Sequence, residues 1–246
     1  TATADAMAAI GATVPYDALL LLGDNVYPRG IPPEADPEFP EARRRLLQQA
    51  AVADSTGLRL VFVPGNHDWN RQSDGGWAQI QRQGIMLGDY ARSRGVAVEL
   101  APLGGCPGPV TIPVTAALRL VAIDTQWWLH GGARPGRAAA TDREVLLDPT
   151  VECPVDSESE LIDALRRINS ERSAPVTVVV GHHPLESHGE HGAHYPWVQW
   201  VFPLVPTPVA AWAWLPIGWI YPLGRKLVGH PQDLPSPANR AMREAI

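Results

Sequence analysis

Three short apolar segments of this chain each run into a glycine and then into side chains that can bind metals or move protons. The segments span residues 18–22, 58–63 and 176–180. The polar residues that follow them are Asp24, Asn66, His67, Asp68, His182 and His183. Apolar runs of this length are typical of strands buried on both faces of a parallel sheet. Because the carboxyl ends of parallel strands meet at one edge, we expect these polar side chains to converge there.

The residues at this predicted edge offer different ligand atoms. The Asp24 carboxylate can bridge two cations, because both of its oxygens carry lone pairs. Asn66 offers a neutral oxygen and His182 an imidazole nitrogen. Tyr27 offers a phenolic oxygen that becomes a strong ligand when a hard trivalent metal removes its proton. The sequence therefore predicts a metal site assembled from distant segments.

The neighbouring polar residues are assigned from their sequence context. His67 and Asp68 are adjacent in a turn, so we expect them to diverge, with His67 pointing inward and Asp68 supporting it by hydrogen bonds. Asp124 ends another apolar segment, where it either faces the site or caps a loop. His130 and His230 are assigned to the surface.

The elements that must position these residues alternate between helix and strand. Helical spacing and capping patterns predict helices at 3–12, 41–54, 74–92 and 157–169, and a last one from residue 236. Further strands are predicted at 96–100, 110–114 and 118–123, and residues 130–154 are predicted to be irregular, with a helical turn near Glu144. This order indicates one mixed α/β layered domain.

Charge and cysteine content narrow the function classes. The 246 residues carry a net charge of -6, which argues against binding nucleic acid through the general field of the protein. An anionic substrate would need local attraction, for example from metal ions. Cys106 and Cys153 are the two cysteines, so four thiolates for a zinc ribbon are not available. They either form a disulfide, which would suit an exported protein, or remain separate thiols.

An uncharged aromatic segment spans residues 196–223. It contains five tryptophans and six prolines, and that many prolines argue against a membrane-spanning helix. The segment is interpreted as an aromatic loop packed on the domain, a lid over the site, or a patch that lies on a membrane surface.

The three motifs together resemble signature blocks of the calcineurin-like metallophosphoesterases. The matching stretches are 23–27 (GDNVY), 65–68 (GNHD) and 179–184 (VVGHHP). They occur in the family's order, each behind a strand, over about residues 19–194. Tyr27, which follows Asp24 by three residues, makes the chain similar to the purple acid phosphatase branch. The resemblance implies an α/β fold with a β-sandwich flanked by helices.

The same resemblance implies roles for individual residues. Asp24 would bridge two metal ions, Tyr27 would bind the first, and Asn66 and His182 would bind the second. The ions would be iron, manganese or zinc. His67 would face the phosphate and act as the catalytic residue, protonating the leaving oxygen or stabilising the transition state. The implied reaction is hydrolysis of a phosphoester by a metal-activated hydroxide.

Further histidines are implied to contact the substrate. His191 stands about nine residues past the metal-binding histidine, and His188 is its rival for this role. His183 is assigned either to the substrate side or to packing. The implied partners are phosphorylated small molecules or proteins, with no nucleic acid and with a membrane surface as an open alternative.

Two family blocks have no full counterpart in the chain. No strand ending in aspartate precedes Asp24, and residues 229–232 (GHPQ) carry only half of the closing Gly-His-x-His block. We therefore expect a single phosphoesterase domain over residues 1–246 that is incomplete at both ends, with an aromatic, proline-rich insertion at about 196–235. The alternative is a non-catalytic or truncated relative that acts as a binding or scaffold domain. An exported or membrane-associated location is favoured over the cytoplasm.

Overall fold

The computed structural model describes residues 2–14, 16–136, 152–171, 174–188, 219–228, 230 and 232–246. Its contacts divide the chain into two compact units, residues 1–182 and 183–246. The predicted helical turn near Glu144 and most of the aromatic segment lie outside the described residues. Whether the whole chain forms a single domain stays a prediction.

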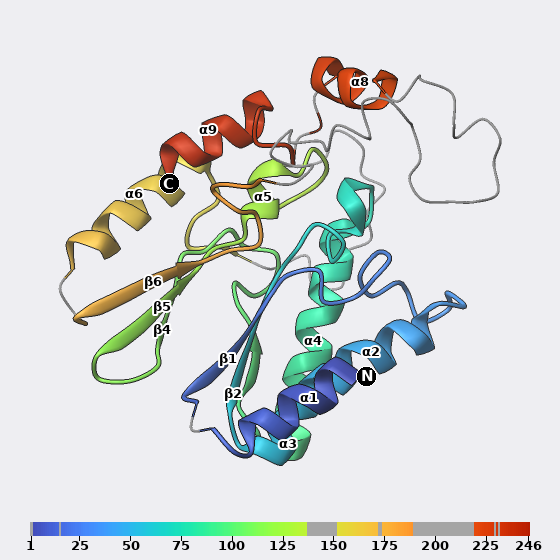
Figure 1. The fold of residues 1–246 in the computed structure, drawn as a ribbon, viewed down its shortest axis with the longest axis vertical. Helices are drawn as coiled ribbons and strands as arrows, with labels where there is room; N and C mark the ends of the chain where they lie inside the picture. Colours follow the sequence, from blue (N-terminus) through green and yellow to red (C-terminus); the bar gives the residue numbers. More distant parts are fainter. Residues whose placement is uncertain are drawn as a thin grey trace. The chain divides into compact units, whose positions relative to one another are not determined.

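The first sheet of the first unit is parallel and holds two of the three motif strands (Figure 1). Its order is β1-β2-β3, formed by Ala18–Leu22, Arg59–Val63 and Val98–Leu100. Leu22 pairs with Val63, so β1 and β2 end side by side. The loops that carry Asp24 and Asn66 therefore leave the sheet at the same edge.

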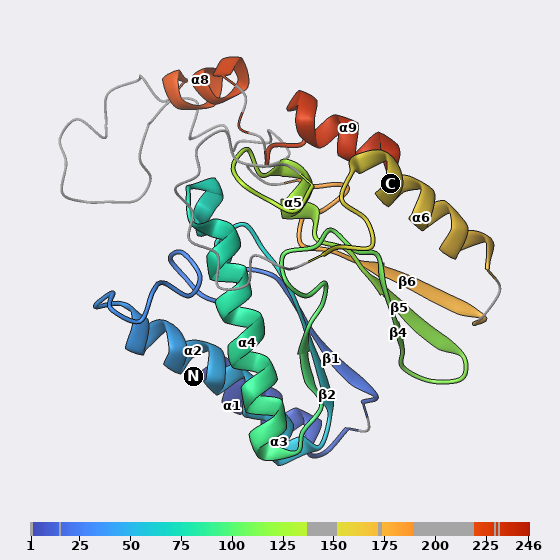
Figure 2. The ribbon, with the colours of Figure 1, turned by 180° about the vertical axis from the view of Figure 1, so that it is seen from behind.

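Four helices accompany this sheet, and Figure 2 shows α4 running alongside it. They are α1 (Ala2–Gly11), α2 (Phe39–Ala50), α3 (Val52–Thr56) and α4 (Gly76–Arg94). Leu60 and Phe62 of β2 are fully buried in the core that the sheet shares with these helices. Successive residues of a strand face opposite sides, which leaves Val61 and Val63 for the other face.

The third motif strand belongs to a second sheet, so the expectation that all three motif strands end at the edge of one parallel sheet is wrong for this strand. The order of the second sheet is β4-β5-β6, formed by Val110–Pro113, Leu118–Ala122 and Val176–Val180. β4 and β5 are antiparallel, whereas β5 and β6 are parallel. Val61 and Val63 of the first sheet share a buried cluster with Ile112, Leu120 and Val180 of the second. This apolar contact ties the motif strands of the two sheets together.

Shorter elements complete the described chain. The first unit adds the 3-10 turn η1 (Asn70–Gln72), α5 (Thr125–Leu129) and α6 (Glu158–Ser170). Ser157 accepts a hydrogen bond from the Glu160 N–H, which confirms the predicted N-cap, and the Glu160 carboxylate accepts one from the backbone N–H of Asp156, one residue before the cap. The second unit contains α8 (Ile220–Val228) and α9 (Pro237–Ala245), whose N-terminus is capped by Ser236.

Two further sequence predictions need correction. The helix predicted at 41–54 is divided into α2 and α3, because the chain tightens at Ala51, whose N–H also reaches the Gln49 carbonyl. His130 is not a surface residue: it ends α5, is only 1% exposed and packs against the Trp69 ring with 4.8 Å between ring centroids. Burial of Trp69 and Trp127 draws this part of the chain into the interior.

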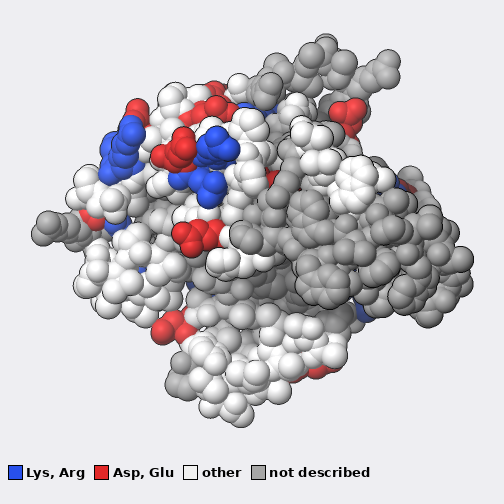
Figure 3. All heavy atoms as spheres, turned by 45° about the horizontal axis from the view of Figure 1, so that its top comes forward, with Lys and Arg blue, Asp and Glu red and all other residues white. Residues whose placement is uncertain are grey.

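The described surface carries charges of both signs. Figure 3 shows acidic and basic side chains in small, separate groups on the described part of one face. Within the described ranges, no helix combines the length and the apolar character needed to cross a membrane.

A disulfide joins Cys106, between β3 and β4, to Cys153, which precedes α6. The sequence left this pairing open. The two cysteines are separated by 47 residues, and closing a loop of that length lowers the entropy of the unfolded chain.

We therefore expect reduction to lower the free energy of unfolding by up to about 4 kcal/mol, as loop entropy alone would give. Urea denaturation followed by tryptophan fluorescence, with and without dithiothreitol, measures this change. The Cys106→Ser/Cys153→Ser variant should match the reduced protein and should not respond to dithiothreitol. Equal stability of oxidised and reduced protein would contradict the prediction.

Candidate active site

Asp24 follows β1 directly, and both of its carboxylate oxygens are engaged. Oδ1 accepts a hydrogen bond from the His67 backbone N–H at 3.0 Å. Oδ2 accepts one from the Tyr27 hydroxyl at 2.7 Å. The side chain is mostly buried, with 14% exposed. The carboxylate therefore faces the loop that follows β2, as a ligand shared between two loops would.

His182, after β6, brings a nitrogen to the same place. Its Nε2 lies 3.0 Å from Oδ1 of Asn66 and 3.3 Å from Oδ1 of Asp24. Its Nδ1 lies 2.8 Å from the Leu22 carbonyl oxygen. A carbonyl oxygen only accepts, so Nδ1 carries a hydrogen, and Nε2 of the neutral ring then presents a lone pair. Three lone-pair atoms from three loops meet here, an arrangement that a cation stabilises.

His67 occupies the opposite side of Asp24. Its Nδ1 lies 2.5 Å from the Pro28 carbonyl oxygen and therefore carries the hydrogen, while Nε2 lies 3.8 Å from Oδ2 of Asp24. The ring packs on Tyr27 with 4.3 Å between centroids. Two contacts thus fix the ring, and Nε2 is the nitrogen turned toward the carboxylate.

Tyr27 contributes its hydroxyl at the edge of this group. Burial, and then the hydrogen bond to Asp24, raise the pKa of Tyr27 to about 12. The phenol is therefore neutral near pH 7. Binding a metal through this oxygen would require the metal to displace the proton.

The buried carboxyl of Asp68 fastens the two loops together. It accepts hydrogen bonds from the backbone N–H groups of Gly65, Asn25 and Val26. It also accepts one from the Asn25 side chain, whose amide donates at the same time to the Val63 carbonyl. Burial, opposed by these hydrogen bonds, raises the pKa of Asp68 to about 7. Sequence reasoning missed Asn25, because nothing distinguishes it from an ordinary turn residue.

Two glycines allow the loops to approach this closely. A Cβ atom on Gly65 would lie 2.2 Å from the Asp24 backbone nitrogen, and one on Gly23 would lie 2.3 Å from Nδ1 of His182. Both distances are far inside van der Waals contact. Any side chain at either position would push the predicted ligands apart.

Asp124 supports the β2 loop from the second sheet. Its Oδ2 accepts a hydrogen bond from Nε1 of Trp69 at 2.8 Å, and its Oδ1 accepts one from the Trp127 backbone N–H at 3.0 Å. Of the two roles left open by the sequence, Asp124 takes the capping role, at the start of α5. Trp69, next to Asp68, is the residue from which this role could have been predicted, because a buried indole N–H needs an acceptor.

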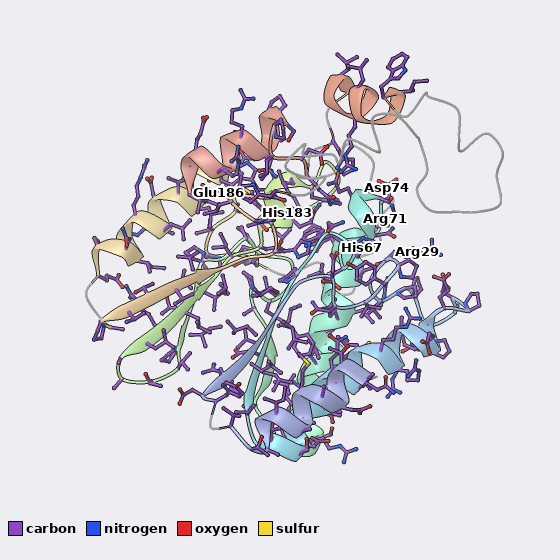
Figure 4. The ribbon with its side chains drawn as sticks, in the orientation of Figure 1. Arg29, His67, Arg71, Asp74, His183 and Glu186 are labelled. Atoms are coloured by element: carbon purple, nitrogen blue, oxygen red, sulfur yellow. A yellow bond between two sulfur atoms is a disulfide. The ribbon has the colours of Figure 1, made fainter. Side chains whose placement is uncertain are left out.

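Backbone strain is concentrated beside the site. In the described chain, the non-glycine residues with positive φ are Asp24, Asn70, Arg71 and Gln72, with φ of 54°, 52°, 52° and 68°. L-residues rarely adopt this conformation, and strain of this kind gathers at functional sites. The Arg71 N–H donates to the Asn66 carbonyl, and Arg29 follows Pro28, whose carbonyl contacts His67; Figure 4 labels both arginines and His67. No residue pattern indicated this left-handed turn.

The histidines assigned to the substrate are placed only in part. His183 and His188 belong to the second unit, in which His183 is buried and His188 is exposed. His191 lies outside the described residues. Their contact with substrate stays a prediction.

Among the residues that the structure describes, the donor set fits one metal ion better than two. No group of three or more His, Cys, Asp or Glu side chains that could hold a metal ion is found in the described ranges. Asp24 and His182 are two such residues, and the third converging atom is the amide oxygen of Asn66. Oxygen and imidazole donors suit manganese, iron or zinc. For a second ion, this group provides only Oδ2 of Asp24 and the Tyr27 hydroxyl.

The buried carboxyl of Asp124 should make stability depend on pH. Burial raises the pKa of Asp124 to about 7, although hydrogen bonds from Trp127 and Trp69 oppose the shift. Between about pH 4 and pH 7 the folded state therefore holds a proton that the unfolded state has lost. The free energy of unfolding should fall as pH rises through this range, by at most about 1.4 kcal/mol per pH unit for this group.

Replacing Asp124 with asparagine should remove this contribution and flatten the profile. Urea denaturation at several values between pH 4.5 and pH 7.5 tests it, with Asp163→Asn at an exposed position of α6 as the control. A slope as steep in Asp124→Asn as in the parent would contradict the assignment.

Comparison with known proteins agrees with the geometry. The calcineurin-like phosphoesterase (Metallophos) family matches residues 2–203. Neither the curated proteins nor the solved structures compared with the chain give a match. The matched range contains the loops after β1, β2 and β6, from which Asp24, Asn66 and His182 converge. The chain belongs to the calcineurin-like phosphoesterase family.

Proposed function

We propose that this chain hydrolyses phosphoesters at the site formed by Asp24, Asn66 and His182. Family membership supports the class of reaction. The observation that carries the placement is the approach of His182 Nε2 to 3.0 Å from the Asn66 oxygen and 3.3 Å from the Asp24 oxygen. When the His182 ring is neutral, its Nε2 lone pair faces the lone pairs of the two oxygens, which is repulsive. A cation bound between the three atoms makes the arrangement favourable.

A binuclear centre is the finer form of this proposal. One ion would be held by Asp24, Asn66 and His182, and the other by Asp24 and Tyr27 with ligands from outside this group. When bound, such ions neutralise the phosphate oxygens and lower the pKa of water. The Tyr27 hydroxyl beside Asp24 supports the purple acid phosphatase-like branch, and the apolar cluster shared by both sheets supports a β-sandwich.

His67 is proposed as the acid that serves the leaving group. Its Nδ1–H is fixed on the Pro28 carbonyl, so the protonated ring has its Nε2–H available for an ester oxygen. The His67 ring packs on Tyr27, and the His67 backbone N–H donates to Asp24. These two contacts hold the ring beside the ligand group. Little rearrangement is then needed when the leaving oxygen gains its proton.

The substrates proposed are phosphorylated small molecules or proteins. His183, His188 and His191 are proposed to contact them, and Asp68 is proposed to support the ligand loops through its hydrogen bonds. The second candidate is a non-catalytic relative that keeps the fold as a binding or scaffold domain. It is favoured by the single well-supplied ion position and is distinguished by the two measurements that follow.

Removing the amide ligand should weaken metal binding. Titration calorimetry with Mn²⁺ should give an affinity at least about tenfold lower for Asn66→Ala than for the parent, because one of three converging donors is lost. Asn169→Ala, at an exposed position near the end of α6, is the matched control and should bind as the parent does. Equal affinity for all three proteins would contradict the proposed ligand set.

Removing the acid should slow hydrolysis while metal binding persists. We expect His67→Gln to lower kcat about 10²- to 10⁴-fold, the range typical of a lost general acid. The loss should be greater for phenyl phosphate than for p-nitrophenyl phosphate, because the more basic leaving oxygen needs the proton more.

The exposed Asn169 again provides the control variant, Asn169→Ala, which should retain the parent's rate. Loss of Mn²⁺ binding in His67→Gln would assign His67 to the ligand set instead. Hydrolysis of neither ester by a parent that binds Mn²⁺ would favour the non-catalytic relative.

A further inference from the structure

The short helix α8 of the second unit presents an apolar face to its surroundings. Ile220, Leu223 and Leu227 follow one another at spacings of three and four residues, which places them on one side of the helix. They are 53%, 39% and 77% exposed, and Trp219, which precedes the helix, is 48% exposed. At 100° per residue, the four side chains span an arc of about 100°. This group is called the α8 apolar face below.

The opposite side of α8 is anchored. Arg225 lies about 180° around the helix from the centre of the α8 apolar face. Its guanidinium donates from Nε and Nη2 to the two carboxylate oxygens of Asp233, both at 2.7 Å. The two side chains are only 17% and 8% exposed. Paired, bidentate contacts of this kind hold a fixed geometry, so α8 is bound through its polar side while its apolar side faces outward.

The sequence around α8 indicates what the face meets. No acidic residue occurs from 191 to 232, although the whole chain has a net charge of -6. The stretch also contains five tryptophans, the residue type enriched where membranes meet water. Of its two basic residues, Arg225 is paired with Asp233, and Lys226 directly precedes Leu227 of the α8 apolar face. A sequence that combines tryptophans, a lysine and no carboxylate with the outward apolar face of α8 is complementary to a lipid surface that carries negative charge.

We propose that the α8 apolar face docks on a membrane surface that contains anionic lipid. With nine residues, α8 is about 14 Å long, less than half of the hydrocarbon thickness, so it lies in the interface and does not span it. This interaction is independent of phosphoester hydrolysis. It would hold the chain beside substrates of the membrane surface without contributing to the chemistry.

Vesicle flotation tests the proposal with the full chain. The parent is floated with vesicles of phosphatidylcholine alone and with vesicles that also contain phosphatidylglycerol. We expect the parent to float with the anionic vesicles. The partition coefficient of Leu223→Gln/Leu227→Gln should be at least about tenfold lower than that of the parent, because two large apolar contacts are removed. Ile10→Gln, at an apolar position of α1 that is 51% exposed, is the control and should float like the parent.

A second measurement reports on the α8 apolar face directly and does not require the double variant to be as stable as the parent. Both native cysteines are bonded to each other, so Leu227→Cys can be labelled selectively with an environment-sensitive fluorophore. Its emission should rise on adding anionic vesicles, whereas a label at Ile10→Cys should not respond.

Three outcomes would overturn the proposal. The first is a parent that does not float with anionic vesicles. The second is flotation that Leu223→Gln/Leu227→Gln leaves unchanged, with a silent label at position 227. The third is a parent that is dimeric by light scattering and becomes monomeric in the double variant without floating, which would assign the α8 apolar face to a second copy of the chain.

Discussion

The candidate site depends on one buried carboxyl. Asp68 accepts hydrogen bonds from the backbone on both sides of the gap between the β1 and β2 loops, at Asn25, Val26 and Gly65. Unpaired N–H groups in such an interior would be costly, so the carboxyl satisfies them and fixes the loops in one register. Asp24 and Asn66 flank these contacts in sequence. Their separation is therefore set by a residue that would touch neither metal nor substrate.

Sequence patterns were sufficient for the elements but not for every contact between them. Apolar, β-branched runs located all three motif strands, because burial on both faces leaves a clear signal. The rule that parallel strands share one edge explains why Asp24 and Asn66 meet, because β1 and β2 are neighbours in one sheet. It does not explain the approach of His182, because β6 belongs to the second sheet, which the shared apolar cluster holds against the first. The Asn25 hydrogen bonds and the left-handed turn at 70–72 could not be predicted, since both depend on how two distant loops meet. The observed helix ends differ from the predicted ones by a few residues, because packing decides where a helix frays.

Strain and close packing occur together at this edge. Asp24 has a left-handed backbone, and two glycines next to the ligand positions leave no room for a Cβ atom. Such a conformation persists only where surrounding contacts determine it fully. Here the contacts come from Asp68 and, through Trp69, from Asp124 on the second sheet. The two sheets thus stabilise the same loop from different sides, and the apolar cluster that they share keeps those supports together.

The disulfide also determines what a protease could separate. Cys106 precedes β4 and Cys153 precedes α6, so the bond encloses both β4 and β5 within one covalent ring. A single cut anywhere inside this ring leaves one connected molecule, in which β5 keeps its covalent path to β6 and to the loop that carries His182. Only reduction would release two fragments. A nicked preparation would therefore stay in one piece on a non-reducing gel, and its mass would exceed that of the uncut chain only by one water molecule.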